Sequence, residues 1–173
     1  GLYGSGKDSA AEILQKMNFY HISLSDILRE ELASKKIKIT RDALINIGNE
    51  LRINNGPDIL ARKALHKIKD GENYVITSLR NPAEVKFLSE RPDFLLVNIV
   101  SPINIRLERI RSRNREEDPK TISQLKEKEN RENSKNTSNQ QLTAVAQLSK
   151  ITINNNKTLS ELEQKVRKVV EDW

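Results

Sequence analysis

The feature that most constrains the fold is the start of the chain, GLYGSGK. Gly1, Gly6 and Lys7 have the G-x-x-x-x-G-K spacing of a phosphate-binding loop, and Gly4 adds a further glycine inside it. Glycine permits backbone conformations that turn successive N–H groups inward, and the N-terminus of a following helix favours an anion. The spacing therefore predicts a phosphate site in which Lys7 reaches the β- and γ-phosphates. Incidental glycines at a flexible terminus are the alternative interpretation.

Asp8 follows the lysine, where a serine or threonine normally holds magnesium. A carboxylate oxygen is also a good ligand for this hard cation, although it repels phosphates unless the metal lies between them. We therefore expect Asp8 to contact Mg²⁺ or its waters; a helix cap or a partner of the helix dipole is the alternative. The loop residues expected to contact a nucleotide are Gly1, Gly4, Ser5, Gly6, Lys7, Asp8 and Ser9.

Apolar runs alternate with helical patterns along the chain, which predicts an α/β protein with a mostly parallel sheet. Strands are expected at 19–24, 74–79, 94–100 and 151–153. Helices are expected at 7–17, 25–35, 40–54, 57–69, 102–113 and 142–148, and after the capping residues Asn81 and Thr158. The polar stretch 114–141 predicts a mobile helical flap. The strand that should lead into the glycine loop would lie before Gly1, so we expect the chain to be part of a longer one.

Composition narrows the class of protein without deciding it. The 173 residues suit one domain, and the absence of cysteine excludes disulfides and thiolate metal sites and favours a cytoplasmic location. No apolar run approaches the ~20 residues of a membrane span. The net charge of +6 fits an anionic small molecule and nucleic acid equally well.

Four segments occur in this order along the chain: GSGKD, HISLSDILREEL, YVITSLRNPAEV and RIRSRNREEDPKT. Their order is more specific than any one of them. Together they resemble the P-loop nucleoside and nucleotide monophosphate kinases. The nearest likeness is to adenylate-kinase-related and deoxynucleoside-monophosphate-kinase-like proteins, including such domains joined to deoxycytidylate deaminases. The resemblance implies a three-layer α/β/α P-loop NTPase fold over residues 1–173, with an acceptor-binding helical region at about 25–70 and a lid at about 114–141. It also implies ATP, Mg²⁺ and transfer of the γ-phosphate to a nucleoside or deoxynucleoside monophosphate.

The resemblance assigns the acceptor site to Ser25, Asp26 and Arg29 in SLSDILRE, and to Arg80 in SLRNP. Arg80 is well placed for a second reason, because ligands of open α/β sheets bind beyond the carboxyl ends of strands. Arg52 is a weaker third arginine for the acceptor. A solvated helix position is the alternative interpretation of Arg29.

Five arginines crowd the segment RLERIRSRNREED, and three of them, Arg106, Arg109 and Arg113, share one helical face. Phosphoryl transfer needs cations around the transferred group, often supplied by a closing lid. The resemblance assigns this task to Arg109, Arg113 and Arg115, and contacts with the donor base to Asn154 and Lys157. A solvated face or a nucleic-acid patch is the alternative, and the aromatic content of only 4% disfavours stacking on single-stranded bases.

One departure from the family pattern affects the chemistry. Many relatives carry an aspartate near the end of the strand at 74–79, where this chain has Thr77 and Ser78. Either Asp8 supplies the missing carboxylate, or metal binding and turnover are weakened. The second outcome would make the chain a non-catalytic nucleotide-binding regulatory domain, which is the alternative function. Asp118 belongs to the lid or caps the helix that follows it.

Overall fold

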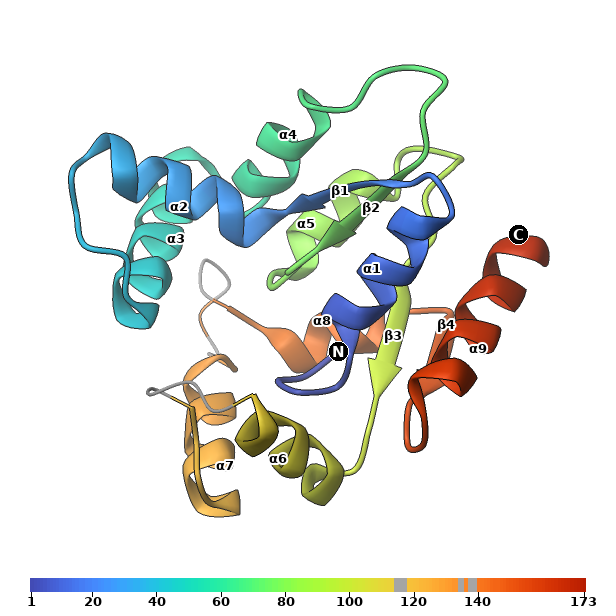
Figure 1. The fold of residues 1–173 in the computed structure, drawn as a ribbon. Helices are drawn as coiled ribbons and strands as arrows, with labels where there is room; N and C mark the ends of the chain where they lie inside the picture. Colours follow the sequence, from blue (N-terminus) through green and yellow to red (C-terminus); the bar gives the residue numbers. More distant parts are fainter. Residues whose placement is uncertain (114–117, 134–135, 137–139) are drawn as a thin grey trace.

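A computed structural model describes residues 1–113, 118–133, 136 and 140–173. In this part of the chain the helices are α1 (Lys7–Lys16), α2 (Leu24–Ser34), α3 (Arg41–Asn55), α4 (Ile59–Leu65), α5 (Pro82–Leu88), α6 (Ile103–Ser112), α7 (Ile122–Arg131), α8 (Leu142–Gln147) and α9 (Leu159–Glu171). The strands are β1 (Tyr20–Ser23), β2 (Tyr74–Thr77), β3 (Val97–Val100) and β4 (Ile151–Asn154). The predicted α/β class is confirmed (Figure 1).

All four of these strands pair in parallel, as the alternation of strands and helices predicted. β1 pairs with β2, so that Ile22 lies opposite Ile76, and β3 pairs with β4, so that Ile99 lies opposite Ile153. Instead of one continuous sheet, the described residues form two two-stranded sheets. Helices connect the parallel strands, since a parallel pair cannot be joined by a tight turn.

Helices cover the strands and extend the molecule to one side. α1 packs against α9 and against β2, while α5 packs against α4 and α8. α2, α3 and α4 pack on one another and form a helical arm, residues 24–65, beside β1 (Figure 1). α7 packs on α6 near the start of α1, which places a helix of the predicted lid beside the glycine loop.

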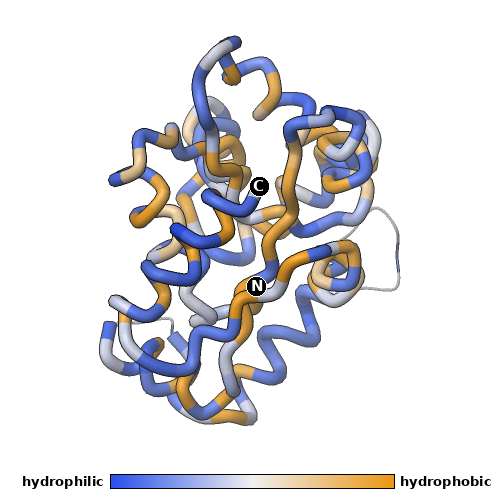
Figure 2. Tube along the Cα trace, turned by 90° about the vertical axis from the view of Figure 1, so that its right-hand side faces the viewer, coloured by the Kyte–Doolittle hydropathy of each residue, from blue (hydrophilic) through white to orange (hydrophobic). Residues whose placement is uncertain are grey.

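The apolar residues form separate cores that match these parts. One lies in the arm and contains Leu28, Leu32 and Leu60, and another joins α1 and α9 across β3 and β4 through Ile13 and Leu162. Figure 2 shows the hydrophobic stretches running through the interior and the hydrophilic ones on the outer turns of the helices. None of the helices in the described ranges is both long and apolar enough to cross a membrane.

Helix starts follow the local sequence closely. The Thr40 hydroxyl accepts a hydrogen bond from Ala43 N (3.1 Å) at the start of α3. Asn81 and Glu84 form the predicted capping box of α5, with proline in the first turn. These side chains satisfy N–H groups that a helix leaves unpaired at its N-terminus.

Several predicted elements are shorter than expected. α4 begins at Ile59 rather than Pro57 and ends at Leu65 rather than at residue 69, because tight turns at both ends replace helical hydrogen bonds. β2 ends at Thr77 because Ser78 has a left-handed backbone (φ 66°), which leaves the extended conformation. β3 begins at Val97 rather than residue 94, since only four residues find partners in β4.

A cavity of about 340 Å³ lies between the two sheets, lined on one side by β2 and on the other by β3. Its walls are largely apolar and include Val75, Ile76, Val97 and Ile99. The strand expected before Gly1 stays a prediction, and the cavity gives it a place of suitable polarity.

Candidate active site

The glycine loop is held in a conformation that requires glycine. Gly4 and Gly6 have φ values of 76° and 101°. A Cβ atom on Gly6 would lie 2.2 Å from Asn155 Nδ2, and one on Gly4 would lie 2.8 Å from the carbonyl oxygen of Arg106. Asn155 Nδ2 in turn donates to the Ser5 carbonyl (2.9 Å). The loop after β4 and helix α6 therefore clamp the glycine loop from both sides.

Ser5 is a buried residue within this loop, and its hydroxyl oxygen finds no hydrogen-bond partner in the described part of the chain. A buried polar atom without a partner is uncommon in folded proteins and needs an explanation. A water molecule or an anionic oxygen seated in the loop would satisfy it. This orphaned hydroxyl fits a loop that is shaped around a ligand.

Lys7 begins α1 and carries the charge of the loop. Its Nζ lies 3.3 Å from Asp8 Oδ1, and burial lowers the pKa of the ammonium group, with Asp8 partly opposing this shift. Arg80 and Arg113 lower the same pKa further, so three cationic groups share one region. A lysine held among like charges gains from an incoming anion, because the anion relieves the repulsion.

Asp8 is the accessible carboxylate of the loop, with 68% of its side chain exposed. Among the described residues, no group of three histidine, aspartate or glutamate side chains could hold a metal by itself. Mg²⁺ commonly binds through one or two carboxylates together with waters and substrate phosphates. The residues present therefore fit an ion that is shared with a bound nucleotide, with Asp8 as its protein ligand.

The end of β2 offers hydroxyl groups that are already engaged. Thr77 Oγ1 lies 2.8 Å from His21 Nε2, and Ser78 Oγ lies 3.2 Å from Ser23 Oγ. Thr77 itself is buried. These bonds tie β2 to β1 and leave Asp8 as the carboxylate nearest to Lys7.

Arg80 lies just beyond β2, where sequence reasoning expected it. Burial lowers the pKa of its guanidinium to about 10, and the positive charges of Arg41 and Arg52 act in the same direction. The side chain forms an ion pair with Glu132, and Arg80 Nη1 donates to Gln140 Oε1 (3.3 Å). The group is thus held in place by residues that follow α7.

Arg41 is a site residue that sequence reasoning missed. It is the first residue of α3, and its guanidinium also forms an ion pair with Glu132. The same guanidinium stacks over the Tyr3 ring, 4.8 Å from its centroid. Nothing in the segment TRDAL marks the arginine as special, because only the packing of the arm brings it to the glycine loop.

Tyr3 links the glycine loop to the lid. Tyr3 Oη donates to Asp118 Oδ1 (2.5 Å), and Arg113 Nε donates to Asp118 Oδ2 (2.6 Å). Arg113 also lies over the Tyr3 ring, 4.6 Å from its centroid. Arg113, expected as a lid cation, is therefore beside the glycine loop, whereas Arg115 lies outside the described residues.

Arg109 and Arg106 have different positions from Arg113. Arg109 donates to Asn155 Oδ1 (3.4 Å) and to the carbonyl of Lys157 (3.3 Å), so it lies at the loop after β4. Asn154 ends β4, Lys157 lies in the loop that follows it, and both are exposed. Arg106 is buried, donates to the Tyr3 carbonyl (3.0 Å) and forms an ion pair with Glu129.

Arg52 lies in the interior rather than at the cavity. Its side chain and that of Glu84 are both fully buried, with Arg52 Nη2 2.8 Å and Nε 3.1 Å from Glu84 Oε1. The other oxygen of Glu84 accepts from Arg80 N (2.7 Å) and Asn81 N (3.0 Å). The pair thus fixes the backbone from which the Arg80 side chain extends.

The start of α2 is more open. Arg29 Nη1 donates to Asp26 Oδ1 (2.6 Å), and 46% and 61% of these two side chains are exposed. Ser25 beside them is half-buried. Over the ranges that the structure describes, no hydrogen bond or ion pair joins these residues to Arg80 or Lys7.

The cavity between the sheets reaches the charged residues. Lys7, Arg80, Glu132 and Tyr3 line it, together with Ser78 at the end of β2. The ammonium group of Lys7, from the glycine loop, and the guanidinium of Arg80, from beyond β2, therefore line the same cavity. Such an arrangement can hold two anionic groups close together.

Comparisons with known proteins identify relatives over the whole length. A family model described as an AAA domain matches residues 1–126. The UPF0200/UPF0201 protein of Archaeoglobus fulgidus is 29% identical over 172 residues, which cover 96% of this chain and 52% of that protein. The chain thus spans about half the length of that relative. The UPF0200 protein of Pyrococcus horikoshii is 32% identical over 179 residues, covering 98% of this chain and 92% of that protein.

Solved structures share the fold at low sequence identity. TT1252 from Thermus thermophilus has a TM-score of 0.64 and 14% identity, covering 99% of this chain and 94% of that one. A gluconokinase from Sinorhizobium meliloti has a TM-score of 0.55 and 18% identity, covering 99% and 91%. These likenesses show a P-loop NTPase-like fold. The chain belongs to the family described as an AAA domain, and it also belongs with the UPF0200 proteins.

Proposed function

We propose that this chain transfers the γ-phosphate of ATP to a nucleoside or deoxynucleoside monophosphate. The observation that carries the proposal is that Lys7 of the glycine loop and Arg80 beyond β2 line one cavity. Transfer between two phosphorylated molecules needs cations at both ends, since the donor and acceptor phosphates repel each other as they approach.

The residues divide between the two substrates. Lys7 and the N–H groups of the glycine loop bind the donor phosphates, and the Ser5 hydroxyl lies unpartnered within the same loop. Arg109 contacts the loop after β4, which lies between Asn154 and the start of α9 and includes Lys157. We assign this region to the donor base. Arg80 and Arg41 hold the acceptor phosphate, and Arg29, with Ser25 and Asp26, bounds the acceptor side along the arm.

The cationic groups carry most of the catalysis, because phosphoryl transfer asks little covalent chemistry of the protein. Arg113, fixed by Asp118 beside Tyr3, neutralises charge on the transferred group, and Arg115 follows it in the lid sequence. Arg52 acts through Glu84 as a positioning residue for Arg80. Mg²⁺, when bound, screens the phosphate charges, and Asp8 is the residue that would hold it.

A phosphate-bearing acceptor suits this site better than a neutral sugar. The related folds include a sugar kinase and a gluconokinase, so the fold alone leaves the acceptor open. Arg80 is half-buried, and its guanidinium and that of Arg41 form ion pairs with the same carboxylate, Glu132. Two guanidinium groups at one point match a dianion, because each offers a fork of N–H donors.

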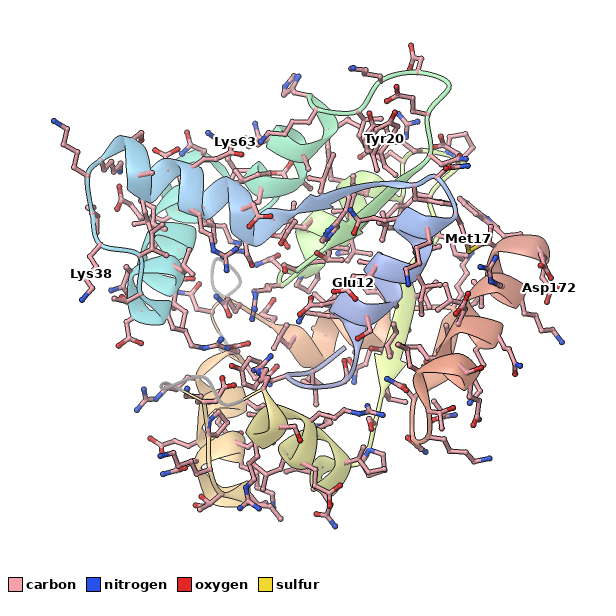
Figure 3. The ribbon with its side chains drawn as sticks, in the orientation of Figure 1. Glu12, Met17, Tyr20, Lys38, Lys63 and Asp172 are labelled. Carbon is pink, nitrogen blue, oxygen red and sulfur yellow. The ribbon has the colours of Figure 1, made fainter. Side chains whose placement is uncertain are left out.

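The test is a coupled assay with ATP and Mg²⁺ across all ribo- and deoxyribonucleoside monophosphates, with gluconate as a further acceptor. Lys7→Ala is expected to lower kcat by at least about 100-fold, since it removes a cation that stabilises the transition state. Lys38→Ala is the matched control, because Lys38 is exposed and extends from the outer end of the arm (Figure 3). Equal turnover by the Lys7→Ala variant would refute the proposal.

A second candidate is a nucleotide-binding domain without transferase activity. Two observations favour it: Asp8 replaces the usual hydroxyl, and Thr77 at the end of β2 is bonded to His21. ATP binding by calorimetry, without transfer to any acceptor in the panel, would select this candidate. Affinity for nucleic acid that falls steeply with salt would favour neither candidate.

A further inference from the structure

Glu132 is the carboxylate on which the acceptor arginines meet. It directly follows α7, is only 4% exposed, and forms ion pairs with both Arg41 and Arg80. Arg41 comes from the helical arm and Arg80 from the sheet, so one carboxylate joins three parts of the fold. The contact lies at the cavity wall, because Glu132 and Arg80 both line the cavity that Lys7 reaches.

We propose that the Glu132 carboxylate occupies the seat of the acceptor's phosphate and makes the site selective for acceptors that carry one. This inference rests on the proposed function in one respect, namely that the seat belongs to the acceptor. A carboxylate and a phosphate present similar planar pairs of oxygens to guanidinium groups, so either can occupy the same position.

The balance of charge supports an exchange. Glu132 brings one negative charge to two arginines, and Lys7 nearby is paired with Asp8. Glu84 is already paired with Arg52, and Asp118 with Arg113. The pocket therefore keeps a surplus of positive charge even with Glu132 in place, and a phosphate dianion would offset more of it than the carboxylate does.

Selectivity follows from what each acceptor can displace. A dianionic phosphate binds both guanidinium groups more strongly than the carboxylate, so it replaces Glu132. A neutral hydroxyl group forms no ion pair, so an acceptor without an anionic group leaves Glu132 on the arginines. The Glu132 carboxylate thus excludes acceptors without an anionic group, and it also holds the two arginines in position.

The experiment measures binding of inorganic phosphate to the chain by calorimetry at constant ionic strength. Glu132→Gln is expected to bind phosphate about tenfold more tightly than the natural chain, equivalent to about 1.4 kcal/mol, because the internal competitor has lost its charge. Glu127→Gln is the matched control on the same helix, since Glu127 is exposed and pairs with Arg131 instead. Arg80→Gln is expected to lose the binding.

Equal or weaker phosphate binding by Glu132→Gln would overturn the inference and make Glu132 a support for the arginines only. A second measurement covers the case in which this variant does not fold. In the natural chain, added phosphate should change the NMR signals of the Arg41 and Arg80 guanidinium groups and of the Glu132 carboxylate together. A shift of the arginine signals with the Glu132 signal unchanged would also refute the inference.

The assay separates this inference from the proposed function. Tighter phosphate binding by Glu132→Gln without transfer to any monophosphate would leave the seat established and refute the transferase. Transfer to monophosphates, with phosphate binding unaltered in Glu132→Gln, would support the transferase and refute the role of Glu132 in the phosphate seat. Adding glucose, which carries no anionic group, to the panel tests the selectivity directly, since the Glu132→Gln variant should discriminate less between acceptors.

Discussion

The buried pair of Arg52 and Glu84 offers the sharpest test of how the acceptor site is built. Both side chains are fully buried, and Glu84 binds Arg52 through one oxygen and two backbone N–H groups through the other. Glu84→Gln keeps the size of the side chain but removes its charge. It leaves the guanidinium of Arg52 buried without a counter-ion, and one of its Nη atoms already has no hydrogen-bond partner among the described residues.

Breaking a buried ion pair by removing one partner costs about 3–5 kcal/mol. For a domain of this size each kcal/mol shifts the midpoint of thermal unfolding by about 2–4 °C, so we expect a fall of about 6–20 °C. The double variant Arg52→Met with Glu84→Gln should lose less than the sum of the single variants, because it leaves no unpaired charge in the interior. Arg80 is expected to lose its position as well, which raises KM for the acceptor.

The assay is urea unfolding followed by circular dichroism, analysed for the midpoint and the slope of the transition. Glu127→Gln provides the control, since it removes an exposed pair that is worth about 0–1 kcal/mol. A destabilisation of under about 1 kcal/mol by Glu84→Gln, well below the range for buried pairs, would refute the reasoning. Additive effects of the two substitutions would refute it too.

Three further predictions follow from the site and the fold. Burial lowers the pKa of the Arg80 guanidinium to about 10, so this group loses charge above that pH. The dissociation constant of phosphate should therefore rise with pH from about 10. A flat profile up to pH 11, measured in a Lys7→Met background, would contradict this prediction. Gly6→Ala should weaken ATP binding by at least about tenfold, because the new Cβ meets Asn155 and the backbone is left-handed; unchanged affinity by calorimetry would contradict the clamp. Five β-branched residues added before Gly1 should raise the thermal midpoint by about 5 °C or more by filling the apolar part of the cavity, between β2 and β3, whereas five Gly–Ser residues should not.

Much of the fold could be predicted from local sequence. Capping residues such as Asn81 and Thr158 mark helix starts because their side chains satisfy N–H groups of the first turn. Apolar runs mark strands because buried parallel strands have two apolar faces. Element ends were less accurate, since Ser78 ends β2 through a backbone conformation that its residue type does not reveal.

Part of the candidate site could be predicted for the same reason. The glycine loop is a local motif, so the spacing of Gly1, Gly6 and Lys7 marks it without reference to the rest of the fold. Arg80 was predictable because strand ends in parallel sheets face one edge. The roles assigned to Asp8, Arg29, Arg109 and the other site residues stay predictions.

The sequence by itself determined the α/β class and the glycine loop, because helix patterns, apolar strand runs and the loop motif each depend on residues close together in the chain. Only the tertiary structure decided which charges meet. Arg52 looked like an acceptor residue and lies buried against Glu84, while Arg41 and Glu132 carried no motif and meet Arg80 at the cavity. Arg80 and Glu132 are 52 positions apart along the chain. Their ion pair and that of Arg41 with Glu132 depend on how the arm and α7 pack, and no local pattern encodes that packing.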